Sequence, residues 1–134
     1  MKRTKITYWI STSIVALMMT FSAYSYLTKP EIAAGFHHLG YPDYFRVELA
    51  IAKLLGAIML LAPVAVRVKE WTYAAFTIVF ISAFIAHTAS GDPLNYRIMP
   101  IIVLGILILS YVTYHRSKTI AQHTSTTQLL SKAA

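Results

Sequence analysis

The sequence predicts an all-α, polytopic membrane protein in which four transmembrane helices form a bundle. Hydrophobic residues make up 57% of the 134 residues and charged residues only 13%, whereas soluble domains usually carry about 25% charged residues. The apolar residues also form stretches of about 17 to 22 residues, close to the length with which a helix crosses a bilayer. The expected spans are 6–27, 47–66, 71–89 and 98–114. The excess apolar surface is therefore expected to face lipid.

The first span, 6–27, contains no charged residue and follows the basic residues Lys2, Arg3 and Lys5. A cleaved signal peptide is the alternative, with a small-x-small site at 23–25. The apolar stretch, however, is longer than the roughly 7–15 residues typical of a signal peptide. Aromatic residues lie near both of its ends, as in the interfacial belts of spanning helices. We therefore expect this helix to be retained.

The connection at 31–44 is long for a link between two helices. Within it, Ile32, Phe36 and Leu39 recur at a spacing that places them on one face of a helix. We therefore expect a short interfacial helix between the first and second spans, followed by a turn at 40–43.

The second span, 47–66, is apolar except near its start and at Lys53. A lysine in the middle of a membrane costs about 2.5–3.5 kcal/mol on insertion scales, so a compensating partner is expected. At about 100° per residue, Lys53 shares a helix face with small residues, which are typical of close helix contacts. These small residues are Ala50, Gly56 and Ala57. We therefore expect Lys53 to lie on a packing face, paired with Asp92 in preference to Glu48.

The third span, 71–89, is preceded by a charged loop at 67–70. Glu70 is expected in the first turn of this helix, where the positive end of the helix dipole favours a carboxylate. Glu70 and Trp71 are interpreted as structural residues at this helix end, as is Gly56 on the packing face of the second span.

The fourth span, 98–114, is the shortest and carries Pro100 in its first turn, where proline is tolerated. Residues 117–134 are rich in Ser, Thr and Gln and show little hydrophobic pattern. We interpret them as a flexible cytoplasmic tail, so that the transmembrane domain covers 1–116.

Basic residues predict the topology, because they are enriched on the cytoplasmic side of membrane proteins. Four spans place both termini on one side. That side would hold the basic residues Lys2, Arg3, Lys5, Arg67, Lys69, Arg116, Lys118 and Lys132, and the other side only Lys29, Arg46 and Arg97. We therefore predict that both termini are cytoplasmic.

In this topology the polar residues within the apolar segments gather toward the outer half of the bundle. Aromatic residues at helical spacing below His87 would line a slot. The candidate ligand-binding residues are Lys53, His87, Asp92, Arg97, Phe80 and Phe84. Each has a structural alternative as well: a buried ion pair for Lys53, a core histidine for His87, and packing for the aromatic residues.

The composition and the motifs of the sequence exclude or disfavour several kinds of chemistry. The chain has no cysteine, which excludes disulfides, thiol redox chemistry and iron–sulfur clusters. The adjacent residues His37 and His38 would point about 100° apart on a helix, so we expect no metal site. No nucleophile–base pair or phosphate-binding loop identifies an enzyme, and no catalytic residue is assigned. No basic block with interleaved aromatic residues indicates nucleic-acid binding.

Four stretches together resemble the DoxX-like family of small bacterial membrane proteins: 38–42, 53–57, 69–74, and His87 with 91–93. The resemblance covers about 8–114, and the departures at Ala75 and Ala86 affect packing and one hydroxyl group. It implies a four-helix protein of the bacterial cytoplasmic membrane. Because the family name derives from subunits of a thiosulfate:quinone oxidoreductase, it also implies a quinone-linked subunit or one associated with a redox complex.

These observations lead to three hypotheses about function. The first is a quinone-linked or redox-associated subunit in which Lys53 and His87 bind a quinone carbonyl, with electrons supplied by a membrane partner. The second is non-enzymatic binding or transport of a small amphipathic or anionic molecule. The third is a structural subunit of a larger membrane complex, or a homo-oligomer. Quinone is the one cofactor proposed, and the lipid bilayer is the expected surrounding of the chain.

Overall fold

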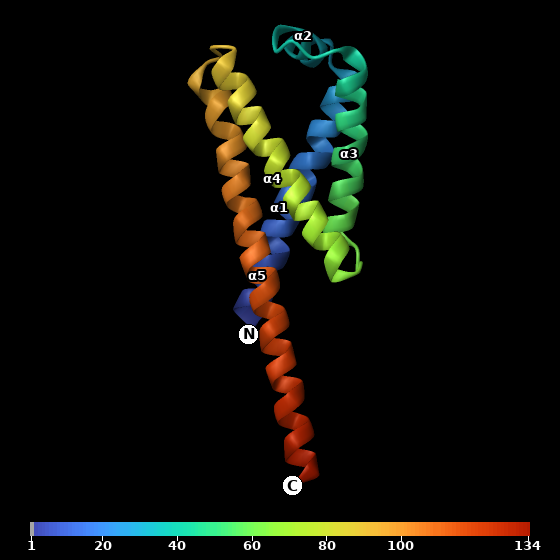
Figure 1. Cartoon of the computed structure of the whole chain (residues 1–134), viewed down its shortest axis with the longest axis vertical. Coiled ribbons are helices and arrows are strands. Elements are labelled where there is room, and N and C mark those ends of the chain that lie inside the picture. The colour runs from blue at the N-terminus through green and yellow to red at the C-terminus, as the bar shows by residue number, and fades with distance from the viewer. Residues whose placement is uncertain (1) are drawn as a thin grey trace.

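The computed structural model describes residues 2–134, and these residues form five α-helices and no β-strand (Figure 1). The helices are α1 (Lys2–Thr28), α2 (Pro30–His38), α3 (Asp43–Leu61), α4 (Val66–Ala89) and α5 (Leu94–Ala133). The predicted all-α fold class is therefore confirmed. A short helix, α2, lies where one was expected, and its position at a membrane surface stays a prediction.

The four long helices form a bundle in which α1 packs against both α3 and α5. Helix α4 packs mainly on α5 and meets α3 over a short stretch only. Helix α2 and the α4–α5 loop lie at one end, called here the α2 end (Figure 1). The N-terminus and the α3–α4 connection lie at the opposite end, called here the N-terminal end, and α5 continues beyond it.

Three of the helices, α1, α4 and α5, are long and apolar enough to cross a membrane. Helix α3 is not among them, because its 19 residues include four charged side chains. These are Asp43, Arg46, Glu48 and Lys53. These three helices support the predicted membrane character of the protein, but the fourth predicted span is not confirmed.

The connection between α3 and α4 differs from its prediction. Helix α3 ends at Leu61, and Ala62 adopts an extended conformation (φ −71°, ψ 151°) before Pro63, since proline disfavours a helical conformation in the residue that precedes it. Helix α4 then begins at Val66, so the charged loop predicted at 67–70 is wrong. Glu70 lies beyond the first turn of α4, and its predicted capping role is wrong for the same reason.

Helix α5 is longer at both ends than the predicted span 98–114. It begins at Leu94, which places Pro100 inside the helix rather than in its first turn. It continues to Ala133, because the sequence after the predicted span contains no Gly or Pro that would end a helix. Its Ser and Thr hydroxyls donate to the preceding turn, as Thr124 does to the Ile120 carbonyl at 3.0 Å. The tail is thus helical and exposed over 121–134, and its flexibility stays a prediction.

Side chains inside the bundle are a mixture of apolar and hydroxyl groups. Leu60, Leu107 and Val15 are fully buried, and beside them Ser110 is hydrogen-bonded to Thr12 at 2.6 Å and to Tyr73 at 2.8 Å. Large apolar side chains cover the outer surface of the long helices, and many of these residues are more than half exposed. Examples are Leu17, Phe21, Leu55, Ile78, Ile85 and Ile102. An apolar exterior of this kind is suited to lipid rather than water.

Candidate functional site

Lys53 projects from α3 into the bundle, and only 5% of the residue is exposed. Its Nζ donates to Ser22 Oγ at 2.9 Å and lies 3.7 Å from the centroid of the Tyr26 ring. Both partners belong to α1 and are well suited to a lysine, which carries three donors and is attracted to an aromatic face. The predicted packing face of Lys53 is therefore confirmed.

The predicted partner of Lys53 is wrong. Among the ion pairs of residues 2–134, none includes Lys53. Asp92 is instead bonded to two histidines, and Glu48 is exposed on α3. Lys53 is thus a buried lysine whose Nζ contacts a hydroxyl group and an aromatic ring but no carboxylate of the described residues.

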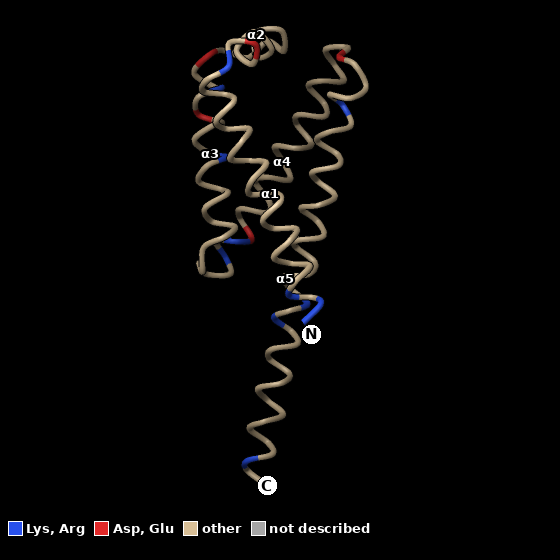
Figure 2. The backbone as a smooth tube through the Cα atoms, turned by 180° about the vertical axis from the view of Figure 1, so that it is seen from behind, with Lys and Arg blue, Asp and Glu red and all other residues tan. Residues whose placement is uncertain are grey.

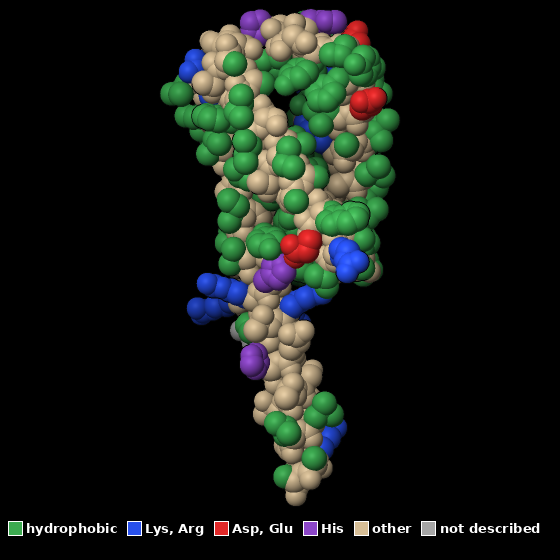
Figure 3. All heavy atoms as spheres, viewed as in Figure 1, with side chains coloured by type: hydrophobic (Ala, Val, Ile, Leu, Met, Phe, Trp, Pro, Cys, Tyr) green, Lys and Arg blue, Asp and Glu red, His purple; other side chains and the backbone are tan. Residues whose placement is uncertain are grey.

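A groove between α3 and α4 reaches Lys53 from the side of the bundle. It has a volume of about 290 Å³, is open to the outside, and has mostly apolar walls. The walls are formed by Leu49, Leu55, Met59, Trp71, Phe76 and Val79, among others. In the space-filling view a hollow with a basic side chain inside it lies between α3 and α4, below α2 (Figure 3). Lys53 is the charged residue among those that line the cavity.

Gly56 brings α3 and α4 close together beside this groove. A Cβ at Gly56 would lie 2.3 Å from the tip of the Phe76 ring, closer than van der Waals contact allows. The predicted packing role of Gly56 is consistent with this contact. Trp71, also predicted as structural, is instead 72% exposed and forms part of the groove wall.

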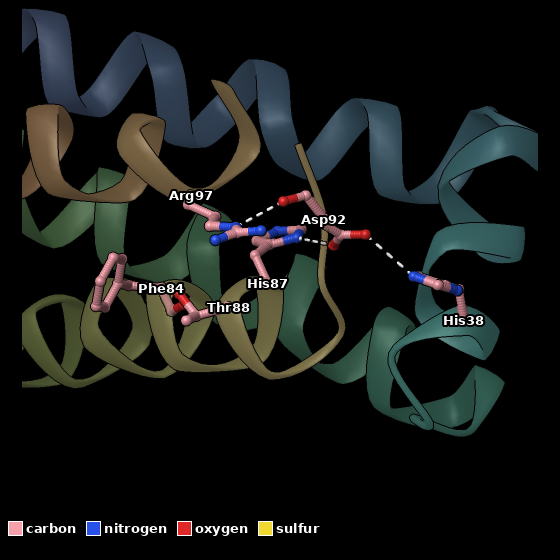
Figure 4. Close-up of polar contacts among 6 residues, drawn as sticks. All are labelled: His38, Phe84, His87, Thr88, Asp92 and Arg97. Atoms are coloured by element: carbon pink, nitrogen blue, oxygen red, sulfur yellow. Dashed lines mark hydrogen bonds and ion pairs between the residues drawn. The ribbon is translucent and has the colours of Figure 1, made fainter. Parts of the chain in front are cut away.

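The aromatic slot predicted below His87 is not formed by the expected residues. Phe80 is a core residue, 5% exposed, whose ring contacts that of Phe76. Phe84 points away from His87 (Figure 4). Neither lines the cavity that Lys53 reaches, so the aromatic contribution to the groove comes from Trp71 and Phe76.

Asp92 forms a second polar cluster, at the α2 end (Figure 4). Its carboxylate accepts from His87 Nδ1 at 2.6 Å and from His38 Nε2 at 3.0 Å. Arg97 Nε donates to the Asp92 backbone carbonyl at 2.6 Å. The hydrogen bond from His87, and then that from His38, lowers the pKa of the Asp92 carboxyl from its ordinary value of 3.8. The structure thus brings together three predicted residues, His87, Asp92 and Arg97, and separates them from Lys53.

The local sequence explains why Asp92 meets His87. Gly91 adopts a positive φ of 71°, and the Gly91 and Asp92 amides donate to the carbonyls of Thr88 and His87. This is the Schellman arrangement that ends helices at a left-handed glycine. It turns the chain back over the last turn of α4, so the Asp92 side chain falls beside His87.

The end of α2 is built in the same way and supplies the other histidine. Gly40 has a φ of 84°, and the amides of Gly40 and Tyr41 donate to the carbonyls of His37 and Phe36. His38 then reaches across the α2 end to Asp92 and links α2 to the α4–α5 loop. Within residues 2–134, no group of three His, Cys, Asp or Glu side chains is arranged to hold a metal ion.

We expect Asp92→Asn to destabilise the protein at neutral pH, because the amide replaces a carboxylate that accepts from two histidines. A lowered carboxyl pKa contributes stability above its unfolded-state value, near 3.8, and that contribution is lost as the pH falls through the lower folded-state pKa. The gap in melting temperature between wild type and Asp92→Asn should therefore close below about pH 4. A gap that stays constant down to about pH 2.5 would show that the carboxylate charge is not the cause.

Lys69 is a second buried lysine, although the sequence predicts it in a loop. Only 6% of it is exposed, and its Nζ donates to Tyr8 Oη at 2.9 Å and to the Leu60 carbonyl at 3.0 Å. Helical spacing was the signal that could have found it, because Lys69 shares a helix face with the buried residues Tyr73, Phe76 and Phe80. The hydrogen bonds of Lys69 therefore link α4 to α1 and to the last turn of α3.

Comparison with known protein families identifies the family of this chain. The sequence model of the DoxX-like family matches residues 10–110, which is most of the chain. No curated protein and no solved structure matches it. The matched segment includes the apolar parts of the four long helices, both buried lysines and the Asp92 cluster. The resemblance that the sequence indicated is thereby confirmed, and the chain is a membrane protein that belongs to the DoxX-like family.

Proposed function

We propose that this protein binds a small amphipathic molecule in the groove between α3 and α4, with Lys53 contacting an anionic or hydrogen-bond-accepting headgroup. One observation carries the proposal: Lys53 is buried, lies outside every ion pair of the described residues, and lines an apolar cavity. Intramembrane charges without a partner are costly, and they are retained mainly where they serve a function. We assign the chain no catalytic residue.

The chemistry of the groove favours this class of ligand. Ser22 accepts one of the three protons that the Lys53 ammonium can donate, which leaves the others for a ligand oxygen. The aliphatic side chains of Leu49, Leu55 and Met59 would surround an apolar tail. A charge-assisted hydrogen bond is strong beside apolar walls, and it would orient the headgroup toward α1.

We propose that α3 is a fourth spanning helix and that the N-terminal end faces the cytoplasm of a bacterial cell. Helix α3 packs along α1, and three of its four charged residues lie toward the α2 end. Basic residues are concentrated at the N-terminal end, and four of the five acidic residues lie at the α2 end (Figure 2). The positive-inside rule then supports cytoplasmic termini in the inner membrane.

A quinone is the second candidate ligand, in a protein that serves as a membrane subunit of a redox complex. Trp71 and Phe76 line the cavity beside Lys53, and flat aromatic side chains stack well on a quinone ring. His87 takes no part in this candidate site, contrary to the sequence prediction, since it is bonded to Asp92 and does not line the cavity.

Mass spectrometry of molecules that co-purify with the gently solubilised protein tests both candidates. We expect a stoichiometric amphipathic molecule with an acidic or carbonyl headgroup. A bound quinone, together with a rise in melting temperature on adding quinone, would select the redox candidate. A protein that retains neither kind of molecule, and is stabilised by neither, would overturn the proposed function.

A further inference from the structure

A second cavity, of about 230 Å³, lies between α4 and α5 toward the N-terminal end. It shares no lining residue with the Lys53 groove. Residues with polar side chains in its lining are Glu70, Tyr73, Thr77 and Tyr111, and the apolar ones are Ala74, Leu107 and Ile108. The cavity is thus a separate site, and its role is independent of the function proposed for Lys53.

Glu70 gives this cavity an acidic group at an otherwise basic end of the molecule. Of the five acidic residues in the chain, Glu70 alone lies at the N-terminal end (Figure 2). Its Oε1 is 2.7 Å from His115 Nε2, but the two atoms are not aligned for a hydrogen bond. The side chain is 35% exposed, so part of the carboxylate is accessible from outside the protein.

Two tyrosine rings stand beside this carboxylate. The rings of Tyr73 and Tyr111 meet edge to face, with centroids 5.2 Å apart and an angle of 75°. The Tyr73 hydroxyl is bonded to Ser110 inside the bundle, which holds the ring in place at the cavity wall. A carboxylate next to aromatic rings is the combination with which proteins bind ammonium groups.

We propose that the α4–α5 cavity binds the primary ammonium headgroup of a membrane phospholipid. The cavity lies between two helices that are long and apolar enough to span the bilayer. Its wall residues Ala74, Ile108 and Tyr111 are exposed on the outer surface, so a lipid reaches it from the side. The acyl chains lie along the exposed residues Ala74 and Ile108, and the Glu70 carboxylate accepts hydrogen bonds from the ammonium group.

Basic residues at the same end complete the match to a zwitterionic headgroup. Arg67 precedes Glu70 by one turn of α4, and Arg116 directly follows His115 on α5. Both are exposed, and a phosphate is a ligand that arginine binds well. A headgroup with a phosphate and a terminal ammonium therefore suits this end better than a purely anionic one.

Native mass spectrometry of the full chain tests the proposal with two phospholipids of identical acyl chains, phosphatidylethanolamine and phosphatidylglycerol. We expect wild type to retain phosphatidylethanolamine preferentially. Glu70→Gln should weaken this binding roughly tenfold, because it removes a charge that pairs with the ammonium, and should leave phosphatidylglycerol unaffected. Glu48→Gln is the matched control: it neutralises an exposed acid of α3 and should change neither lipid.

A second variant keeps the test decisive if Glu70→Gln fails to fold. Tyr111→Leu removes an exposed ring from the cavity wall and should lower phosphatidylethanolamine binding about fivefold. Equal retention of the two lipids by wild type would overturn the proposal, as would unchanged binding in Tyr111→Leu. Displacement of the lipid by an equal concentration of free ethanolamine would overturn the assignment to a lipid in favour of a soluble amine.

Discussion

Lys53→Met is expected to remove ligand binding from the α3–α4 groove and to leave the fold intact. Methionine has nearly the volume of lysine and is apolar, so the space beside Ser22 and Tyr26 stays filled. Ser22 loses its donor but can bond to a carbonyl of the preceding turn, as other hydroxyls of α1 do. The ligand loses a charge-assisted hydrogen bond beside apolar walls, which corresponds to about 2 kcal/mol or more and roughly a thirtyfold loss of affinity.

The measurement is the amount of co-purified molecule per chain, together with the melting temperature in the same detergent. Lys29→Met is the matched control, because Lys29 is an exposed residue that follows α1 and its loss changes the net charge equally. Ligand loss should occur in Lys53→Met alone. If Lys53→Met unfolds the protein instead, Lys53 serves to hold α3 against α1 and the binding proposal fails.

Lys69→Met is expected to have the largest effect on stability, a loss of about 3 kcal/mol in the free energy of unfolding. Two buried groups lose their donor: the Tyr8 hydroxyl and the Leu60 carbonyl. The carbonyl belongs to the last turn of α3, where no intrahelical amide is available to it and where a cation is favoured by the helix dipole. Each unsatisfied buried group costs about 1–3 kcal/mol.

Equilibrium unfolding in mixed detergent micelles measures this loss. Lys118→Met is the control, since Lys118 is exposed and its Nζ lies 5.1 Å from the centroid of the Tyr114 ring, and it should change stability by less than about 0.5 kcal/mol. Tyr8→Phe should destabilise the wild type but have little further effect in the Lys69→Met background, because the two residues share one hydrogen bond. Additive effects would contradict the proposed bond.

Helical periodicity predicted much of the architecture. The apolar stretches located all four long helices, and the spacing of small residues around Lys53 correctly placed that lysine on a buried face. Such inferences succeed because the 3.6-residue repeat is a local property and the choice between lipid and protein contact depends on composition. Helix ends were predicted less well, since Arg67, Lys69 and Glu70 form the start of α4 rather than a loop.

Pairing of charged residues could not be predicted in the same way. Asp92 was expected to reach Lys53, but the turn at Gly91 directs it to His87, and His38 approaches from a different helix. Lys69 and Glu70 are neighbours in the sequence, yet one points into the bundle toward Tyr8 and the other toward His115 on α5. A rotation of about 100° between adjacent helical residues is enough to send them to different partners.

The sequence by itself therefore determined that the protein has an apolar surface suited to lipid, and it determined the helical class, the family and the buried face of α3. These depend on composition and on local periodicity, which a single chain displays directly. Only the tertiary structure decided which polar groups meet. Lys53 finds a hydroxyl and a ring instead of a carboxylate, Lys69 caps α3, and Glu70 faces a cavity, because hydrogen bonds and ion pairs depend on distances of about 3 Å between separate helices.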